Sequence, residues 1–556
     1  MRLIKQLLVA LVIASLLEGW WSCDGCLDDE RNALLQLKAS FNNPLDRSLS
    51  SWGIDTDDCC KWENIHCNST TGRVSQLTIW SYGWYVTDRY FNASLFLPFQ
   101  ELTSLSLPHG FIDCVENEGF ERLESLNKLE FLDLDRSWFN NISILSSIGH
   151  LSSLKSLSLA YIGLESVTDI QGLSRLENLE FLDLSGNNFN DSIIPSLSVF
   201  PSLKSLNLAY NRLESVTDFQ GLSELEKLEF LDLSCNKFNS GITPFCIDFS
   251  SLRSLYLWDN GLTGTIDIKR VSKLGNLEFL DLSHDNYGNS FLPSFGDLSY
   301  LKKFILSQCG LREAIDIQKL SNGTSLKFLN LAGNEIESLK SFQGGGDGGG
   351  EELQKLSNLE YLDLSYNRLD NNSLSSLRTL SSLKFLNMEY NLLEGLINME
   401  ELDALGNLEV LSLGGNQITK VVASGDMRVV RNLSALFLDN VTTHGRSSIQ
   451  LELLGAYPFL KTLSLTHNSF KGAIFAQELG NLTSVEELFL DYSSLDEQSF
   501  KSLGALPSLN VLSMYALNAT LPTEGLLNFK NLVYLDLSFF YSPQQLLERH
   551  WKDIIT

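Results

Sequence analysis

Leucine and other apolar residues recur along this chain at the first, fourth and sixth positions of a nine-residue segment that commonly ends in asparagine. The segment LEFLDLSGN at 179–187 returns as LEFLDLSCN at 228–236, and variants follow about every 24 or 25 residues. Polar and apolar residues alternate within each segment, which is the two-residue period of a short β-strand. Each segment therefore predicts one strand whose leucines point into a core.

Repetition on this scale decides the fold class. A period of roughly 20 to 29 residues with this leucine spacing is the signature of a leucine-rich-repeat solenoid, in which no coil buries its apolar face without neighbours. We expect an α/β fold, a horseshoe or superhelix with a parallel β-sheet on its concave face. Nineteen segments begin at Val74, Leu102, Leu129, Leu154, Leu179, Leu203, Leu228, Leu252, Leu277, Leu301, Leu326, Leu359, Leu383, Leu408, Leu433, Leu460, Val485, Leu509 and Leu532.

The asparagine that ends many segments has a structural interpretation. Its side-chain amide both donates and accepts hydrogen bonds, so it can satisfy backbone groups that the tight bend leaves unpaired. These asparagines are Asn187, Asn211, Asn236, Asn260, Asn334, Asn367, Asn391, Asn416 and Asn468.

A second period lies on top of the first. Residues 159–190 match residues 208–239 at 25 of 32 positions, an offset of 49 residues, which indicates that the chain grew by duplicating pairs of coils. The doubling predicts widely spaced aromatic rings on the concave sheet. Phenylalanine and smaller or charged residues alternate there as Ser156, Phe181, Ser205, Phe230, Ser254, Phe279, Lys303 and Phe328.

Two irregularities interrupt the pattern. Between Leu326 and Leu359 the interval grows to 33 residues, and the surplus carries GGGDGGGEE at 344–352. No Lys-Ser/Thr follows these glycines, so we interpret them as a flexible bulge on the convex side or edge rather than a phosphate loop, with a ligand-contacting insertion as the alternative. The signal for a second strand in each coil survives only in fragments such as LTGTI (262–266), which predicts a patchy lateral sheet.

Charge narrows the possible partners. A net charge of −27 and a pI near 4.6 argue against nucleic-acid binding, which normally shows a basic stripe. Aspartate occupies the middle outward position of several strands, where it either attracts a basic ligand or belongs to the repeat template, and we favour the template. These residues are Asp183, Asp232, Asp281, Asp363 and Asp536.

The sequence contains few features that are typical of an enzyme. Seven histidines are scattered along the chain, without the motifs of zinc proteases, α/β-hydrolases or kinases. A glycosidase-like carboxylate pair on the aspartate row would lack an enclosing pocket to shift its pKa values. We therefore predict no enzymatic activity, no catalytic residues, no metal site and no cofactor.

The N-terminus has the pattern of a secretion signal, assigned to residues 1–22. Arg2 and Lys5 precede an apolar run from Leu7 to Leu17, which is too short to span a bilayer. Asn-x-Ser/Thr acceptors then predict a glycosylated extracellular chain. They are Asn68, Asn92, Asn141, Asn190, Asn322, Asn371, Asn432, Asn440, Asn481 and Asn518.

Cysteines mark an N-terminal cap, assigned to residues 23–73, ahead of a solenoid over 74–556. Five of the nine cysteines crowd this region, at Cys23, Cys26, Cys59, Cys60 and Cys67. An open solenoid end needs a polar, fastened lid, and thiols of a secreted cap form disulfides more readily than metal sites. The stretch CLDDERNALLQLKASF predicts an amphipathic helix of this lid. Cys235 and Cys246 are close enough in sequence to meet within one coil, whereas Cys114 and Cys309 are expected to be free or buried.

The run CLDDERNALLQLK at 26–38, the run DDCCKWENIHC at 57–67 and the repeats after them resemble the ectodomains of plant leucine-rich-repeat receptor-like proteins. Receptor kinases and polygalacturonase inhibitors share this cap. The resemblance implies the disulfides Cys26–Cys59 and Cys60–Cys67. It also implies a receptor that binds a peptide, protein or glycan on its concave or lateral face and acts with kinase co-receptors in defence or development. The alternatives are a secreted inhibitor of a pathogen cell-wall hydrolase and a truncated decoy.

The C-terminus departs from that family. After LVYLDLSFF the chain ends in YSPQQLLERHWKDIIT, without a cysteine-bearing cap or an apolar run of the roughly 18 residues that span a membrane. We expect either a truncated or a naturally shortened family member. Its location is the outer face of the plasma membrane if a full-length form has a span, and otherwise the apoplast.

Candidate ligand-contacting residues are those that depart from the repeat template. Aromatic residues flanked by charge on an open sheet are common anchors of interfaces. The candidates are Tyr256, Trp258, Phe279, Phe437, Asp439, Phe489, Asp491 and Tyr515.

Overall fold

The structure is a computed structural model that describes residues 26–41, 49–54, 56–80, 90–109, 113–137, 143–214, 222, 224–238, 250–264, 275–288, 299–316, 325–340, 358–402, 404–422, 432–441, 457, 459–470, 482–504, 506–519, 529 and 531–538. The chain forms two compact units, residues 1–240 with 244–260 (unit 1) and residues 241–243 with 261–556 (unit 2). Positions in a coil are counted from the first apolar residue of the nine-residue segment, so Leu179 is position 1 and Asn187 is position 9.

Unit 1 opens with helix α2, Asp28–Ser40. Three acidic residues in its first turn and Lys38 in its last turn interact favourably with the helix dipole. Ala33, Leu34 and Leu37 recur at intervals of one and three residues on one face and are buried, which explains why this stretch is an amphipathic helix.

Two disulfides fasten the cap behind this helix. Cys26 is joined to Cys59 and Cys60 to Cys67, the pairing that the family resemblance implies. A 3-10 helix, Cys59–Lys61, leads into β1, Ile65–Cys67, which pairs antiparallel with β2, Val74–Thr78. The first strand of the ladder, β2, is thus already hydrogen-bonded to β1 of the cap on one side.

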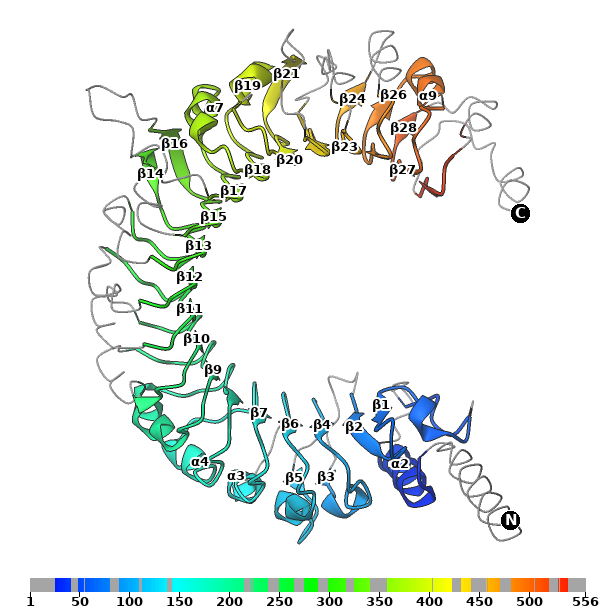
Figure 1. Cartoon of the computed structure of the whole chain (residues 1–556), viewed down its shortest axis with the longest axis vertical. Coiled ribbons are helices and arrows are strands. Elements are labelled where there is room, and N and C mark those ends of the chain that lie inside the picture. The colour runs from blue at the N-terminus through cyan, green and yellow to red at the C-terminus, as the bar shows by residue number, and fades with distance from the viewer. Residues whose placement is uncertain are drawn as a thin grey trace, which may run out of the picture. The chain divides into compact units, whose positions relative to one another are not determined.

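From β2 onward, unit 1 is a ladder of parallel strands, one from each coil (Figure 1). Equivalent positions lie opposite each other, so Phe131, Ser156 and Phe181 are register partners. Leucines at positions 1, 4 and 6 are buried, and each contributes roughly 1.5–3 kcal/mol by leaving water. The strands are β2, β4 Ser104–Ser106, β6 Phe131–Asp133, β7 Ser156–Ser158, β8 Phe181–Asp183, β9 Ser205–Asn207, β10 Phe230–Asp232 and β11 Ser254–Tyr256.

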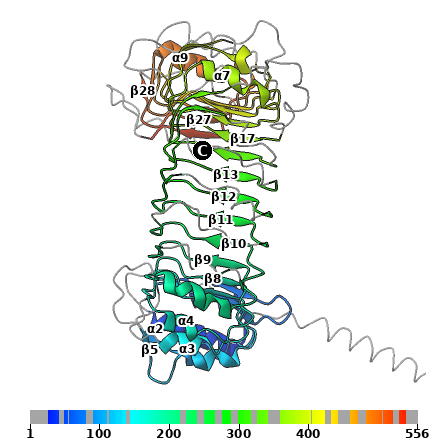
Figure 2. The same ribbon diagram turned by 90° about the vertical axis from the view of Figure 1, so that its left-hand side faces the viewer.

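Unit 2 repeats the same design. Its strands also pair in parallel with equivalent positions opposite each other. Figure 2 shows β12 and β13 side by side in this ladder. The strands are β12 Phe279–Asp281, β13 Lys303–Ile305, β15 Phe328–Asn330, β17 Tyr361–Asp363, β18 Phe385–Asn387, β20 Val410–Ser412, β22 Ala435–Phe437, β23 Thr462–Ser464, β25 Glu487–Phe489, β27 Val511–Ser513 and β29 Tyr534–Asp536. Both units are therefore leucine-rich-repeat solenoids.

The position-9 asparagines form a buried ladder in each unit, as predicted. In unit 1, Asn187 Nδ2 donates to the carbonyl oxygens of Leu159, Leu184 and Ser185 at 2.9–3.2 Å. Its Oδ1 accepts from the backbone N–H groups of Ile162 and Leu164 in the preceding coil, at 3.3 and 3.0 Å. Each amide therefore ties its own bend to the coil before it.

The remaining elements lie on the other side of each ladder, as Figure 1 shows for α3, α4 and α7. Second strands occur only in small separate parallel sheets among the described residues, which agrees with the predicted patchy lateral sheet. The strands are β3 Tyr90–Phe91 with β5 Asp113–Cys114, β14 Arg312–Ile315 with β16 Glu335–Leu339, β19 Glu394–Asn398 with β21 Gln417–Val422, and β24 Ser469–Phe470 with β26 Ser494–Leu495 and β28 Asn518–Ala519. The helices are α3 Ser143–Ile148, α4 Val167–Gln171, α7 Asn372–Ser376 and α9 Glu497–Leu503, with 3-10 turns at Ala93–Leu95, Phe120–Ser125, Asp191–Val199, Leu377–Thr379 and Met399–Leu402.

Several predictions fall outside the described residues: the signal at 1–22, Cys23, the glycine-rich insertion at 344–352, Cys246 and the C-terminal tail beyond residue 538. Cys114, Cys235 and Cys309 are free thiols. No helix in the described ranges has the length and apolar character that crossing a bilayer requires.

Candidate binding surface

Outward side chains at positions 3, 5 and 7 of the parallel ladder form what we call the strand face. In unit 1, position 3 reads Phe131, Ser156, Phe181, Ser205 and Phe230 on consecutive strands in register. Because serine neighbours each ring, large parts of the rings meet solvent, and Phe131 and Phe181 are 36% and 48% exposed. The doubled period therefore does place spaced aromatic rings on the strand face of unit 1.

Unit 2 arranges the same row differently. Phe328, Tyr361 and Phe385 occupy consecutive strands and stack, with ring centroids 4.1 and 4.2 Å apart. The Nζ of Lys303 lies 5.9 Å from the centroid of the Phe328 ring. The faces of these rings are covered by the neighbouring rings. The row therefore stabilises the sheet and presents mainly ring edges to a ligand.

The aspartates at position 5 belong to the framework. Asp183 Oδ1 accepts from the backbone N–H of Ser185 at 2.8 Å, and its Oδ2 accepts from Asn207 Nδ2 at 3.0 Å. The same contact to the residue two positions on recurs at Asp232, Asp281, Asp363 and Asp536. The carboxylate closes the turn after the strand, which is the template role favoured from the sequence, while its negative charge stays on the strand face.

Asp439 and Asp491, two of the candidate contacts, also have structural partners. Asp439 Oδ1 accepts from Ser464 Oγ at 2.6 Å and from the backbone N–H of Thr466 at 2.8 Å. Asp491 makes the equivalent bonds to Ser513 and Tyr515, at 2.7 and 2.8 Å. Both carboxylates hold the next coil, so the charge beside the aromatic rings has a structural use that the sequence interpretation did not include.

The structure only partly brings the aromatic candidates together. In unit 1, Tyr256 lies 5.2 Å from the Phe230 ring, and Trp258 meets Tyr210 edge-on at 5.8 Å. Phe279 belongs to unit 2, so it does not extend a patch within unit 1.

In unit 2, Phe437 and Phe489 flank Ser464 in register, two strands apart. Tyr515 meets Tyr492 at 5.3 Å. Every one of these candidate aromatic residues is only half-exposed.

Sequence reasoning missed a row of exposed aromatic residues at position 8. The chain there adopts a positive φ, for example 55° at Tyr210 and 54° at Tyr366, which turns the side chain outward beside the strand face. Tyr366 stacks on Tyr390 at 4.5 Å, and His467 on Tyr492 at 4.6 Å. The available signal was a tyrosine immediately before the ladder asparagine, as in LAYN, LSYN and MEYN.

Position 2 carries a row of alternating charge that also follows from the doubled period. In unit 1, Lys155 pairs with Glu130 at 2.7 Å and Lys204 with Glu180 at 2.6 Å. In unit 2, Lys327 and Lys384 both bind Glu360, at 2.8 and 2.9 Å, and line a recess with Asn358, Ser382 and Asn407. Hydrogen bonds from these two lysines lower the pKa of Glu360 to about 2. The positive charges of these position-2 lysines are thus largely neutralised by glutamates of neighbouring coils.

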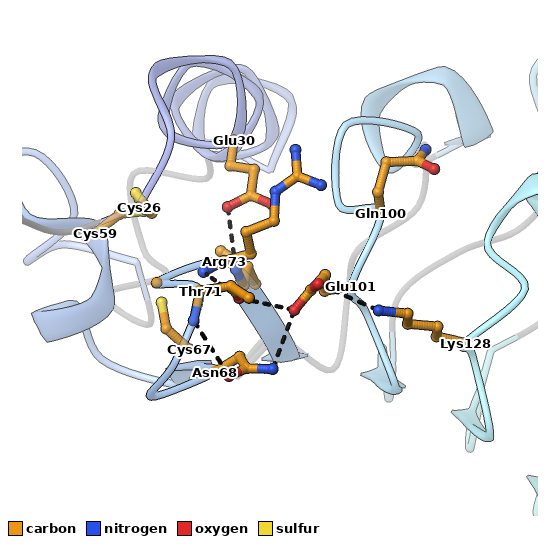
Figure 3. A network of polar contacts seen from close by, with 12 residues as sticks. Cys26, Glu30, Cys59, Cys67, Asn68, Thr71, Arg73, Gln100, Glu101 and Lys128 are labelled. Carbon is orange, nitrogen blue, oxygen red and sulfur yellow. Dashed lines mark hydrogen bonds and ion pairs between the residues drawn. A yellow bond between two sulfur atoms is a disulfide. The ribbon is translucent and has the colours of Figure 1, made fainter. Parts of the chain in front are cut away.

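A polar network joins the cap to the first coils (Figure 3). Glu101 accepts hydrogen bonds from Asn68 Nδ2 at 3.1 Å, Thr71 Oγ1 at 2.8 Å and Lys128 Nζ at 3.2 Å. The hydrogen bonds from Thr71 and then Lys128 lower the pKa of Glu101. The network holds the hairpin between β1 and β2 against the following coils.

Glu30 on α2 is the buried charge of this junction. Its Oε2 accepts from the backbone N–H of Val74 at 3.0 Å, while its Oε1 lies 3.8 Å from Arg73 Nε and accepts no hydrogen bond from any described residue. Burial raises the pKa of Glu30 against the lowering effects of Val74 and Arg73. The folded cap therefore binds a proton at Glu30 more readily than the unfolded chain does. Protonation of Glu30 stabilises the fold fully below the pKa that Glu30 has in the unfolded chain. This stabilisation is lost as the pH rises through the pKa of Glu30 in the folded cap.

Lowering the pH from about 7 to about 4, below the ordinary pKa of glutamate, is therefore expected to raise the melting temperature of the wild type relative to the Glu30→Gln variant. Glutamine keeps the acceptor for Val74 and removes the titration. Thermal unfolding of both proteins at the two pH values checks this. Equal shifts in the two proteins would contradict a role for Glu30.

The predicted glycosylation sites remain predictions. Asn190 is exposed, and its Oδ1 accepts hydrogen bonds from the backbone N–H and the hydroxyl group of Ser192. Asn92 caps a 3-10 turn with Oδ1 in the same way. The amide nitrogens of Asn68, Asn371 and Asn432 each donate one hydrogen bond, and Asn440 is exposed. Asn141, Asn322, Asn481 and the side chain of Asn518 lie outside the described residues.

Comparison with known proteins accords with this geometry. A family model for the leucine rich repeat N-terminal domain matches residues 27–68, and leucine rich repeat models match 178–200, 227–249 and 355–377. Receptor like protein 21 of Arabidopsis thaliana is 37% identical over 210 residues. Receptor-like protein 9b of the same plant is 39% identical over 175 residues. This chain is similar to plant receptor-like proteins.

The similarity to these receptor-like proteins is partial in length. The two alignments cover 34% and 30% of this chain and only 20% and 17% of the relatives. Among solved structures, a leucine-rich-repeat protein of Leptospira interrogans matches with 25% identity and a TM-score of 0.55, over 73% of this chain and 95% of that one. The structural match supports the solenoid fold.

Proposed function

We propose that this chain is the extracellular recognition module of a plant receptor-like protein. It binds a peptide, protein or glycan ligand on its strand face and acts with kinase co-receptors in defence or developmental signalling at the plasma membrane. It performs no catalysis in this proposal, because the carboxylates of the strand face are bound into turns and neighbouring coils rather than gathered in an enclosed site.

The observation that carries the proposal is the set of solvent-exposed aromatic rings beside aspartates whose carboxylates are already bound into turns and neighbouring coils. Phe131, Phe181 and Tyr210 of unit 1 are 36–48% exposed, although rings of this size normally gain free energy by burial. Aromatic side chains concentrated on one face are typical anchors of binding sites. Similarity to plant receptor-like proteins supports a recognition role for that face.

A binding experiment tests the proposal. The glycosylated chain, secreted from plant cells and immobilised on a biosensor, is exposed to co-receptor kinase ectodomains and to fractions of microbial extracts. We expect saturable binding that weakens in Phe181→Ala or Phe437→Ala. The same binding should persist in Phe459→Ala, a control at an exposed phenylalanine that precedes position 1 of its coil and so lies outside the strand face. Absence of saturable binding, or equal binding by all variants, would remove the proposal. Inhibition of a microbial cell-wall hydrolase in the same fractions would favour the inhibitor alternative instead.

A further inference from the structure

The alternation on unit 1 sets a repeat distance for a ligand. β6, β8 and β10 carry phenylalanine at position 3 and aspartate at position 5, whereas β7 and β9 between them carry serine or asparagine at both positions. Equivalent rings therefore recur on every second strand, which is about 9.6 Å along the ladder. We call the set Phe131, Asp133, Phe181, Asp183, Phe230 and Asp232 the Phe–Asp row.

This distance discriminates between the conformations that a bound peptide can adopt. A polyproline II helix has three residues per turn and presents the same face about every 9.3 Å. A β-strand presents the same face about every 6.7 Å, and two turns of α-helix measure about 10.8 Å. Over one interval of the row, the polyproline II repeat differs by about 0.3 Å, the α-helix by about 1.2 Å and the strand by about 3 Å.

The negative charge of the Phe–Asp row favours a peptide with positive charge. No lysine or arginine among the described residues forms an ion pair with Asp133 or Asp183, and the nearby Lys155 and Lys204 are paired with Glu130 and Glu180. Asp133 and Asp183 thus present negative charge at the same interval as the rings. A basic residue in each turn of the ligand complements them.

The serine strands supply hydrogen-bond donors between the rings. The hydroxyl groups of Ser156 and Ser205 form no hydrogen bond with other described residues and stand in register with the phenylalanines. A polyproline II backbone has no internal hydrogen bonds, so its carbonyl oxygens remain available to such donors. Proline-rich segments characteristically dock on aromatic surfaces of this kind.

We propose that unit 1 binds a basic, proline-rich peptide in the polyproline II conformation, with one residue in three packed against successive rings of the Phe–Asp row. The inference rests on the proposed recognition function and names the chemistry of its ligand. Prolines pack on Phe131, Phe181 and Phe230, and a basic side chain of each turn lies near the neighbouring aspartate.

Fluorescence anisotropy with the full secreted chain tests the repeat and the charge. The probe is a labelled peptide of repeated Lys-Pro-Pro triplets. One control peptide repeats Lys-Pro-Pro-Pro, which lengthens the interval to about 12.4 Å, and the other repeats Glu-Pro-Pro. We expect the triplet peptide to bind at least about tenfold more tightly than either control. Equal binding of the triplet peptide and either control, or no triplet binding, would overturn the inference.

Two variants connect that binding to the row. Phe181→Ala removes the central ring, and Asp133→Asn removes a charge while keeping an acceptor for the backbone N–H of Asp135 and a partner for Ser106 Oγ. Each should weaken triplet binding about five- to tenfold, with Phe459→Ala unchanged. Wild-type affinity in both variants would contradict the site. If the triplet peptide fails while the biosensor experiment still shows saturable, Phe181-dependent capture, the peptide inference is wrong and the recognition function stands.

Discussion

Replacing Asn211 by alanine is expected to lower the free energy of unfolding of unit 1 by about 2–4 kcal/mol. The Asn211 amide is buried, donates to the carbonyl oxygens of Leu184, Leu208 and Ala209 at 3.0–3.2 Å, and accepts from the backbone N–H of Phe189 at 3.0 Å. Alanine removes these bonds together and leaves buried backbone groups without partners. Urea unfolding measures the loss, and amide hydrogen exchange should show the fastest new opening at β8 and β9.

Asn178→Ala is the matched control. Its side chain is exposed and makes one hydrogen bond, of 3.2 Å, to the carbonyl oxygen of Ser152. Its removal should change stability by no more than about 0.5 kcal/mol. Equal losses in the two variants would mean that the ladder amides contribute no more than surface asparagines.

Removing the Cys26–Cys59 disulfide with paired serine substitutions should cost about 4 kcal/mol of cap stability, because the bond closes a separation of 33 residues. It anchors the start of α2 to a fully buried Cys59 and so protects the apolar end of the first coil. Thermal unfolding and limited proteolysis of the cap under oxidising conditions measure the effect.

The Cys60–Cys67 bond provides an internal comparison, since it closes a separation of only seven residues. Paired serine substitution there should cost about 2 kcal/mol on the same chain-entropy argument. A larger loss at Cys60–Cys67 than at Cys26–Cys59 would show that loop entropy does not govern the stability of this cap.

The architecture was predictable from the sequence because one interaction pattern repeats. Leucines at positions 1, 4 and 6 have no burial partner except the neighbouring coil, so their spacing leaves few alternatives to a parallel ladder. The ladder asparagines were predictable for a similar reason, since a side-chain amide offers two donor hydrogens and an acceptor oxygen to the backbone groups of such a bend. The spaced rings at Phe131 and Phe181 followed from the doubled period.

The candidate site was less predictable, since it depends on which contacts a side chain makes across coils. Asp439 and Asp491 look like free charges in the sequence, yet each accepts hydrogen bonds from residues more than 20 positions away. Phe328 resembles Phe181 in its segment, but its neighbour on the next strand is Tyr361 rather than serine, so it stacks. The tyrosines of position 8 were missed because their outward orientation comes from a backbone φ that the segment pattern does not reveal.

The alternating charges of position 2 limit how this gene can change in length. Loss of the single coil that bears Lys155 would set Glu130 beside Glu180, two like charges on adjacent strands, and would also bring Phe131 against Phe181. In the stretch of unit 1 from Glu130 to Arg253, where the charges alternate without a break, loss of two coils restores opposite neighbours at the junction. Recombination among such genes should therefore leave viable alleles that differ by even numbers of coils, and the spacing of the rings would be inherited unchanged.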